Sequence, residues 1–308
     1  MSRIPLNRRT FMGTCAAGAV LGLAGFPAKA AVPSIRTRPI PKTGERIPVI
    51  GMGTWITFNV GESVKLRDDR AEVLARFFEL GGGMVDSSPM YGSAEAVVGY
   101  GLKKLGTPGN LFSATKVWTP LTAGGRSQIG DSRRLWGLGT IDLFQVHNLL
   151  NWEAHLETLR AEKAAGRIRY IGITTSHGMR HADMATIMSS EDIDFVQLTY
   201  NATDRDAEDR LLPLAAERGI AVICNRPYRR GQLIDTVQKH PLPAWAADAG
   251  VANWPEFLLK FIVSHPAVTC AIPATSQLMH MTENMGALRG PFPDAKMRTR
   301  MADHVRSL

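Results

Sequence analysis

The chain has 308 residues, of which 44% are hydrophobic and 21% are charged. This is an ordinary globular composition, and the length allows one large domain or two small ones, which can bury a core without disulfides or metals. The formal net charge is +8, but residues 1–30 hold four basic and no acidic side chains, so the remainder has 32 basic and 28 acidic residues. Because no Lys/Arg block stands out in that remainder, we expect no nucleic-acid partner.

The first 30 residues have the pattern of a targeting segment. A polar start ends in Arg8-Arg9-Thr10-Phe11, and an apolar stretch then leads to Ala28-Lys29-Ala30, the small-x-small pattern of a cleavage site. The order Arg-Arg-x-Phe resembles the twin-arginine signal that exports folded bacterial proteins. An uncleaved anchor is the alternative, but the apolar run is short and rich in Gly and Ala. We predict a signal peptide over residues 1–30, a mature domain over 31–308, the twin-arginine export machinery as a partner, and a periplasmic location.

After residue 35 a short apolar run and a stretch with helical periodicity alternate repeatedly. Each run has the length of a strand buried on both faces. The expected strands cover residues 49–55, 84–88, 111–117, 141–147, 168–174, 195–200, 220–225 and 268–273. The expected helices cover residues 70–80, 94–105, 152–165, 179–189, 207–218 and 254–264, with one or two more from residue 279 onward.

Eight such units predict a closed (β/α)₈ TIM barrel as a single domain. An open doubly wound sheet is the alternative architecture. Against it, no G-x-G-x-x-G follows the first strand, and the polar candidates follow many different strands instead of one switch point. Cys224 and Cys270 lie inside apolar runs, so we expect buried free thiols, and no residue spacing suggests a metal site.

Four ionisable side chains stand at the carboxyl ends of three successive expected strands, where a barrel places its chemistry. Asp86 ends the second strand and Tyr91 follows it, Lys116 lies near the end of the third, and His147 ends the fourth. Each residue alone has an ordinary structural explanation, but together they form a coherent acid–base set. An ammonium paired with a carboxylate would lower the pKa of the tyrosine, which would protonate a developing alkoxide, while the histidine holds the carbonyl oxygen or relays the proton.

The chain resembles the aldo-keto reductase family through motifs that extend over nearly all of residues 31–308. These motifs are Gly51-Met52-Gly53-Thr54-Trp55, Asp86-Ser87-Ser88-Pro89-Met90-Tyr91-Gly92, Thr115-Lys116, Asp142-Leu143-Phe144-Gln145-Val146-His147, Gly166-Arg167-Ile168-Arg169-Tyr170, Gln197 with Tyr200-Asn201, and Ile272-Pro273-Ala274-Thr275 with Glu283-Asn284. The resemblance implies that Tyr91 is the general acid, that Lys116, Asp86 and His147 complete a tetrad, and that a nicotinamide cofactor lies extended across the barrel mouth.

The same resemblance implies a set of cofactor contacts. The expected residues are Thr54, Trp55, Thr174, Thr175, Gln197, Asn225, Arg226, Pro227, Thr275, Ser276, Gln277, His280 and Asn284. Several depart from the family pattern: Thr174-Thr175 replaces Ser-Asn, and Asn225-Arg226-Pro227 replaces a stacking Tyr before Ser-Pro, so Tyr228 is a candidate to stack on the nicotinamide. Ala274 and His280 stand where NADP-preferring relatives have Lys and Arg, so the choice of cofactor stays open. We expect NADP(H), with NAD(H) as the alternative.

The leading hypothesis is an NAD(P)H-dependent reduction of an aldehyde or ketone by a monomer. We expect the small carbonyl substrate to contact aromatic side chains, namely Trp55, Tyr91, Trp118, His147 and Trp152. We expect its specificity to depend on loops 118–126 and 229–255 and on the C-terminal tail. One alternative is an exported nucleotide-binding or regulatory module with little turnover; another is an unrelated barrel in which Lys116 forms a Schiff base. Export also raises the question of how spent cofactor is recycled, which favours tight binding or a redox partner.

Overall fold

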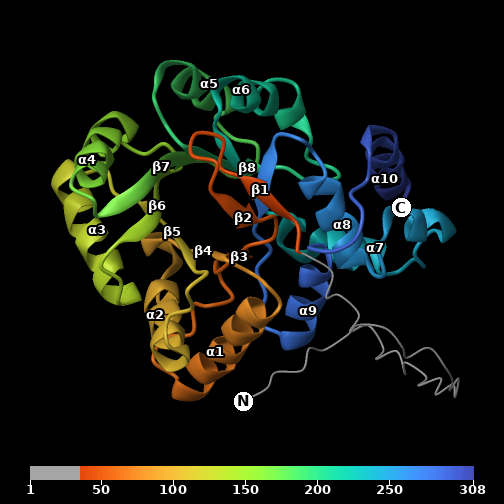
Figure 1. Cartoon of the computed structure of the whole chain (residues 1–308), viewed down its shortest axis with the longest axis horizontal. Coiled ribbons are helices and arrows are strands. Elements are labelled where there is room, and N and C mark those ends of the chain that lie inside the picture. The colour runs from red at the N-terminus through yellow and green to blue at the C-terminus, as the bar shows by residue number, and fades with distance from the viewer. Residues whose placement is uncertain (1–34) are drawn as a thin grey trace, which may run out of the picture. The chain divides into compact units, whose positions relative to one another are not determined.

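Eight parallel strands surround the centre of the fold in the computed structural model, which describes residues 35–308 (Figure 1). Each strand is hydrogen-bonded to the next one in the chain, so the order around the sheet is the order of the sequence. The strands are β3 (Met52–Gly53), β4 (Met84–Asp86), β5 (Phe112–Val117), β6 (Ile141–His147), β7 (Ile168–Thr174), β8 (Phe195–Thr199), β9 (Ala221–Asn225) and β10 (Val268–Ala271). Every predicted strand is confirmed, with ends trimmed by up to three residues.

Backbone contacts between the first and last strands close the sheet into a barrel. Ile50 and Gly53 form parallel bridges with Ala271 and Ala274. The amide of Gly51 donates to the carbonyl of Ala271 over 2.9 Å. The closed TIM barrel is therefore confirmed, and the open doubly wound alternative is excluded.

Helices cover the outside of the barrel. The helices that follow the barrel strands are α1 (Val64–Glu79), α2 (Ala94–Leu105), α3 (Thr122–Trp136), α4 (Trp152–Ala164), α5 (His181–Ser190), α6 (Leu211–Arg218), α7 (Gln232–Val237), α8 (Trp254–Val263) and α9 (Leu278–Gly286), and α10 (Ala295–Ser307) ends the chain. Helix α9 packs against α1 and α8, which completes the ring, and α10 packs on the outside of α8 (Figure 1). Within this described part, no helix combines the length and apolar character needed to cross a membrane.

Helix α3, helix α7 with two 3₁₀ turns, and a hairpin before β3 were not expected from the sequence. Helix α3 begins with Thr122-Ala-Gly-Gly, and two glycines in its first turn hide the helical pattern, so part of the expected loop 118–126 is helical. The expected loop 229–255 likewise contains α7 and two 3₁₀ turns, Arg229–Gly231 and Ala244–Ala249.

The other unexpected element is an antiparallel hairpin that closes one end of the barrel. Its strands are β1 (Thr37–Pro39) and β2 (Arg46–Pro48). Ile40 and Ile47 are buried in one cluster with side chains from the amino ends of barrel strands, including Met84, Phe112 and Phe195. Figure 1 shows this hairpin across the barrel end that faces the viewer. Because this end is filled, the carboxyl ends of the strands form the accessible mouth.

The buried free thiols of Cys224 and Cys270 confirm the expectation for both cysteines.

Helices α2 and α3 approach closely enough that their contact depends on a glycine. A Cβ atom at Gly99 would lie 1.8 Å from the carbonyl oxygen of Leu135, so a side chain there must push the two helices apart. Gly130, on the exposed side of α3, has no atom within 4 Å of such a position.

We predict that Gly99→Ala lowers the free energy of unfolding by about 1–3 kcal/mol because of this overlap. Gly130→Ala should raise it by up to about 1 kcal/mol, since alanine is the better helix former and meets nothing. Urea denaturation followed by tryptophan fluorescence measures both. Equal stabilities for the two variants would contradict the predicted close contact between α2 and α3.

Candidate active site

A buried ion pair lies at the carboxyl ends of β4 and β5. The Lys116 Nζ atom is 2.6 Å from Asp86 Oδ2, and both side chains are almost completely buried. The same ammonium donates to the carbonyl oxygen of Ser87 over 2.7 Å. Neighbouring strands bring the pair together, since β4 and β5 are aligned with Asp86 beside Ala114, two residues before Lys116.

Side-chain amides hold the second oxygen of the Asp86 carboxylate. Gln197 on β8 donates to Oδ1 over 2.9 Å, and Gln145 on β6 does so over 3.3 Å. The Thr54 hydroxyl donates to the Asp86 carbonyl oxygen over 2.9 Å. Gln197 and Thr54 were predicted as cofactor ligands; in the structure Gln197 braces the carboxylate and Thr54 holds the backbone of Asp86. Gln145 was not predicted as a site residue, although it lies two residues before His147 on the same face of its strand.

The surroundings keep Lys116 charged. Burial by itself would lower the pKa of this ammonium, but Asp86 and Tyr91 outweigh burial and raise the pKa above its ordinary value. A protonated amine is not a nucleophile, so this charge state disfavours the Schiff-base alternative.

Tyr91 lies at the end of a 3₁₀ turn, Pro89–Tyr91, between β4 and α2. Its ring centre is 5.0 Å from Lys116 Nζ and 5.8 Å from the centre of the His147 ring, which it meets edge-on. Unlike Lys116, Tyr91 remains partly accessible from the mouth. The structure therefore brings together the four residues of the predicted tetrad.

The expected lowering of the Tyr91 pKa needs a correction, because Lys116 does act to lower this pKa but burial acts more strongly in the opposite direction. Burial raises the pKa of the Tyr91 hydroxyl, and the opposing effect of the Lys116 ammonium is smaller, so the pKa lies above its ordinary value and not below it. Tyr91 is therefore fully protonated at neutral pH. The ammonium beside it still favours the phenolate at the moment when the proton leaves.

His147 is neutral at physiological pH. Burial and the Lys116 charge together lower its pKa to about 3. Its Nδ1 atom is 2.9 Å from the hydroxyl oxygen of Ser88, and the side chains of both residues are buried. The histidine thus acts through hydrogen bonds, not as a cation.

The residues predicted to hold the nicotinamide amide group lie around Gln197. Thr174 Oγ1 is 3.3 Å from Gln197 Oε1, and Asn225 Nδ2 donates to the carbonyl of Thr175 over 2.9 Å. The Asn225 oxygen accepts from Thr199 over 2.7 Å. Thr175 Oγ1 is buried and has no hydrogen-bond partner among residues 35–308. This orphaned hydroxyl beside Gln197 fits a ligand with a carboxamide group.

The hydroxyl of Tyr228 is engaged within the protein, while stacking of its ring on the nicotinamide stays a prediction. Its hydroxyl donates to Asn284 Oδ1 over 2.6 Å, which ties the loop after β9 to helix α9. Asn284 itself was predicted to contact the cofactor, and this bond engages its side-chain oxygen. Pro227 is buried between Arg226 and Tyr228.

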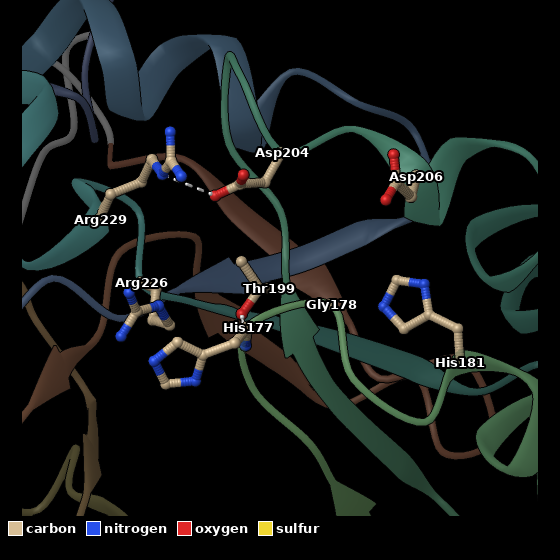
Figure 2. Close-up of a pocket in the computed structure, with 8 residues that line it drawn as sticks. All are labelled: His177, Gly178, His181, Thr199, Asp204, Asp206, Arg226 and Arg229. Atoms are coloured by element: carbon tan, nitrogen blue, oxygen red, sulfur yellow. Dashed lines mark hydrogen bonds and ion pairs between the residues drawn. The ribbon is translucent and has the colours of Figure 1, made fainter.

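A pocket of about 280 Å³ opens beside the end of β9 (Figure 2). His177, Gly178, His181, Thr199, Asp204, Asp206, Arg226 and Arg229 surround it. Arg229 pairs with Asp204 over 3.3 Å, whereas the Nη1 atom of Arg226 is buried without a hydrogen-bond partner in the described part of the chain. Burial and the nearby Arg230 lower the pKa of Arg226. A group with negative charge would satisfy this guanidinium.

The loop after β9 also reaches across the mouth. Arg226, Arg229 and Arg230 all have positive φ, which is unusual for residues other than glycine and frequent at functional sites. The Arg230 guanidinium lies 5.0 Å from the centre of the Trp55 ring, on the loop after β3. Sequence reasoning singled out Trp55 and Arg226 but missed His177, Asp204 and Arg230, because no motif marks them.

The remaining predicted cofactor residues lie at the start of α9. Thr275 Oγ1 accepts from the amide of Gln277, the residue directly before α9, and Ser276, Gln277 and His280 are accessible. The amide groups in the first turn of a helix favour a phosphate. These residues follow β10, whereas the tetrad residues lie on or directly after β4, β5 and β6. A dinucleotide bound in an extended conformation would contact both groups. Among the described residues, no group of three or more His, Cys, Asp and Glu side chains is arranged to hold a metal ion.

We predict that Lys116→Met lowers the free energy of unfolding by about 3–5 kcal/mol, because it leaves the Asp86 carboxylate buried without its counter-charge. The double variant Asp86→Asn/Lys116→Met should recover a large part of that loss. Lys65→Met, which removes an exposed pair with Asp69, should cost less than about 0.5 kcal/mol. Chemical denaturation compares the three, and a Lys116→Met variant as stable as Lys65→Met would rule out the strong pairing.

Comparison with known proteins shows the family of this chain. The family model described as "Aldo/keto reductase family" matches residues 49–302. Methylglyoxal reductase YeaE of Escherichia coli is 29% identical in an alignment of 266 residues that covers 82% of this chain and 89% of that protein. An aldo/keto reductase from Klebsiella pneumoniae, solved with NADPH, is 22% identical with a TM-score of 0.74 and covers 88% of this chain and 95% of its own. Aldo-keto reductase AKR11C1 from Bacillus halodurans, in its holo form, is also 22% identical, with a TM-score of 0.72 over 88% of this chain and 96% of its own. With the family match extending over most of the barrel, this chain belongs to the aldo/keto reductase family.

Proposed function

We propose that this protein reduces an aldehyde or ketone to the alcohol with NADPH, with NADH as the alternative cofactor. The observation that carries the proposal is the buried Lys116–Asp86 pair beside a protonated Tyr91 and a neutral His147 at the open end of the barrel. When bound, the reduced nicotinamide supplies a hydride for the carbonyl carbon. The protein must then place a proton donor at the carbonyl oxygen.

In this proposal Tyr91 donates its hydroxyl proton to the oxygen as negative charge develops there. The raised pKa of Tyr91 keeps the proton available over the neutral range. The Lys116 ammonium, 5.0 Å from the ring centre, stabilises the phenolate that remains. The neutral His147 donates a hydrogen bond to the same oxygen and contributes no charge of its own.

The residues present fit a nicotinamide dinucleotide. Thr174, Thr175 and Gln197 would hold the carboxamide, and the Arg226 guanidinium and the first turn of α9 offer donors to the phosphate groups. Ala274 and His280 offer no guanidinium or ammonium for a 2′-phosphate. Similar proteins include one solved with NADPH and one named NADH-specific methylglyoxal reductase, so both cofactors occur among them.

In this proposal the substrate binds at the mouth against the aromatic side chains of Trp55, Trp118 and Trp152 beside the tetrad, and the protein acts as a monomer. An aldehyde or ketone with an apolar body suits such a lining. Methylglyoxal is a rational first compound to assay, because two similar proteins are named for its reduction. Those names, and the tetrad itself, do not favour a regulatory module without turnover.

We predict that Tyr91→Phe reduces kcat by about 10²–10⁴-fold and leaves cofactor affinity nearly unchanged, because the ring remains and only the proton donor is lost. Steady-state assays give kcat, and tryptophan-fluorescence titrations with NADPH and NADH, side by side, give the affinities of both variants. Near wild-type turnover by Tyr91→Phe would refute the role of Tyr91. Absence of any response to either nucleotide in cofactor-free protein would contradict the proposed cofactor site and indicate a scaffold that has given up its cofactor.

The proposed export concerns residues 1–30, which lie outside the described residues. In this proposal the protein folds and binds its nucleotide first and then crosses the inner membrane, so that it either retains the cofactor tightly or depends on a partner that regenerates it. We predict that cell fractionation recovers a periplasmic form whose N-terminus begins near residue 31. Arg8→Lys/Arg9→Lys should abolish that form, and recovery of an uncleaved native protein from the cytoplasm would contradict export.

A further inference from the structure

The hydroxyl group of Ser88 connects the turn that carries Tyr91 to the ring of His147. Ser88 caps the 3₁₀ turn Pro89–Tyr91: its carbonyl accepts from the Tyr91 amide over 2.9 Å, and its hydroxyl oxygen accepts from the Met90 amide over 3.2 Å. The same oxygen is 2.9 Å from His147 Nδ1. Ser88 is fully buried, so water does not complete its hydrogen bonds.

Counting the protons at this hydroxyl decides which nitrogen of His147 carries hydrogen. The Ser88 oxygen already accepts from Met90, and the hydroxyl proton has no acceptor other than Nδ1 among residues 35–308. If Nδ1 were protonated, the buried Ser88 proton would be left without a partner, which is costly. Nδ1 therefore accepts, and the ring proton lies on Nε2.

The Nε2 atom is the one that the structure leaves free. Among the described residues it makes no hydrogen bond, whereas Nδ1 is engaged by Ser88. The edge-on contact with the Tyr91 ring places the imidazole beside the proposed proton donor. An Nε2–H group at this position donates to a carbonyl oxygen, while a bare Nε2 would repel it.

We propose that Ser88 is a positioning residue that holds His147 in the Nε2–H tautomer, so that the mouth of the barrel presents two hydrogen-bond donors, Tyr91 and His147, to one substrate oxygen. The inference rests on the proposed carbonyl reduction for its catalytic meaning but not for its structural content. One residue then sets two features of the site: its backbone closes the turn that orients Tyr91, and its side chain selects the tautomer of His147.

The tautomer is measured directly on the full chain, without substrate or cofactor. Long-range ¹H–¹⁵N spectra of protein labelled with ¹⁵N-histidine separate the two tautomers at neutral pH, and the signals missing from His147→Gln identify His147 among the eight histidines. Wild type should show a protonated Nε2 and an unprotonated Nδ1. In Ser88→Ala the two tautomers should become mixed, and Ser88→Thr, which keeps a hydroxyl, should restore the wild-type pattern.

Kinetics provide the second measurement. Ser88→Ala should lower kcat about 10-fold, a part of the roughly 10²–10⁴-fold that a positioned proton-transfer group contributes, with a much smaller change in KM. Ser132→Ala, which removes a buried hydroxyl from α3 in the outer ring, should leave kcat and the His147 spectrum unchanged. Circular dichroism confirms that each variant is folded.

The possible results separate the two proposals. A protonated Nδ1 in wild type, or an unchanged tautomer in folded Ser88→Ala, would overturn the role of Ser88 whatever the enzyme reduces. An Nε2–H tautomer that depends on Ser88, in a protein that reduces no carbonyl, would uphold the positioning and reject the proposed function. Because the wild-type spectrum alone tests the proton count, the inference remains testable even if Ser88→Ala does not fold.

Discussion

The ion pair between Lys116 and Asp86 is the interaction on which the rest of the site depends. Two charges removed from water are costly unless they are close together and their remaining hydrogen-bonding capacity is filled. The structure meets both conditions, with a 2.6 Å contact, two amides on Asp86 and the Ser87 carbonyl on Lys116. The two amides come from β6 and β8 and the carbonyl from the residue after β4, so with Asp86 on β4 and Lys116 on β5 the pair links four of the eight barrel strands.

The positive charge held in this way sets the state of its neighbours. The same ammonium opposes protonation of His147 and lies over the face of Tyr91. Burial acts on both residues as well, and in each case it favours the neutral form. The mouth therefore holds a buried ion pair beside two neutral side chains, Tyr91 and His147, that can donate hydrogen bonds. Such donors suit an oxygen that gains negative charge.

The two ends of the barrel are divided between stability and chemistry. At the amino ends of the strands, the β1–β2 hairpin and the large side chains of Phe112 and Phe195 fill the interior. At the carboxyl ends lie the tetrad, the strained arginine-rich loop after β9 and the first turn of α9. Because one end is filled by packing, polar residues at the other end are free to meet ligands.

Hydrophobic periodicity in the sequence was sufficient to predict the barrel, all eight strands and the four tetrad positions, because buried parallel strands are short apolar runs and functional groups follow their carboxyl ends. The glycine-rich start of α3 and the hairpin before β3 were missed, since local pattern carries little signal for either. Only the tertiary structure showed that burial outweighs Lys116 at Tyr91, that Gln145 braces Asp86 and that Ser88 meets His147. Charge state and tautomer depend on distance and on exclusion of water between residues up to 59 positions apart, which no local pattern in the chain encodes.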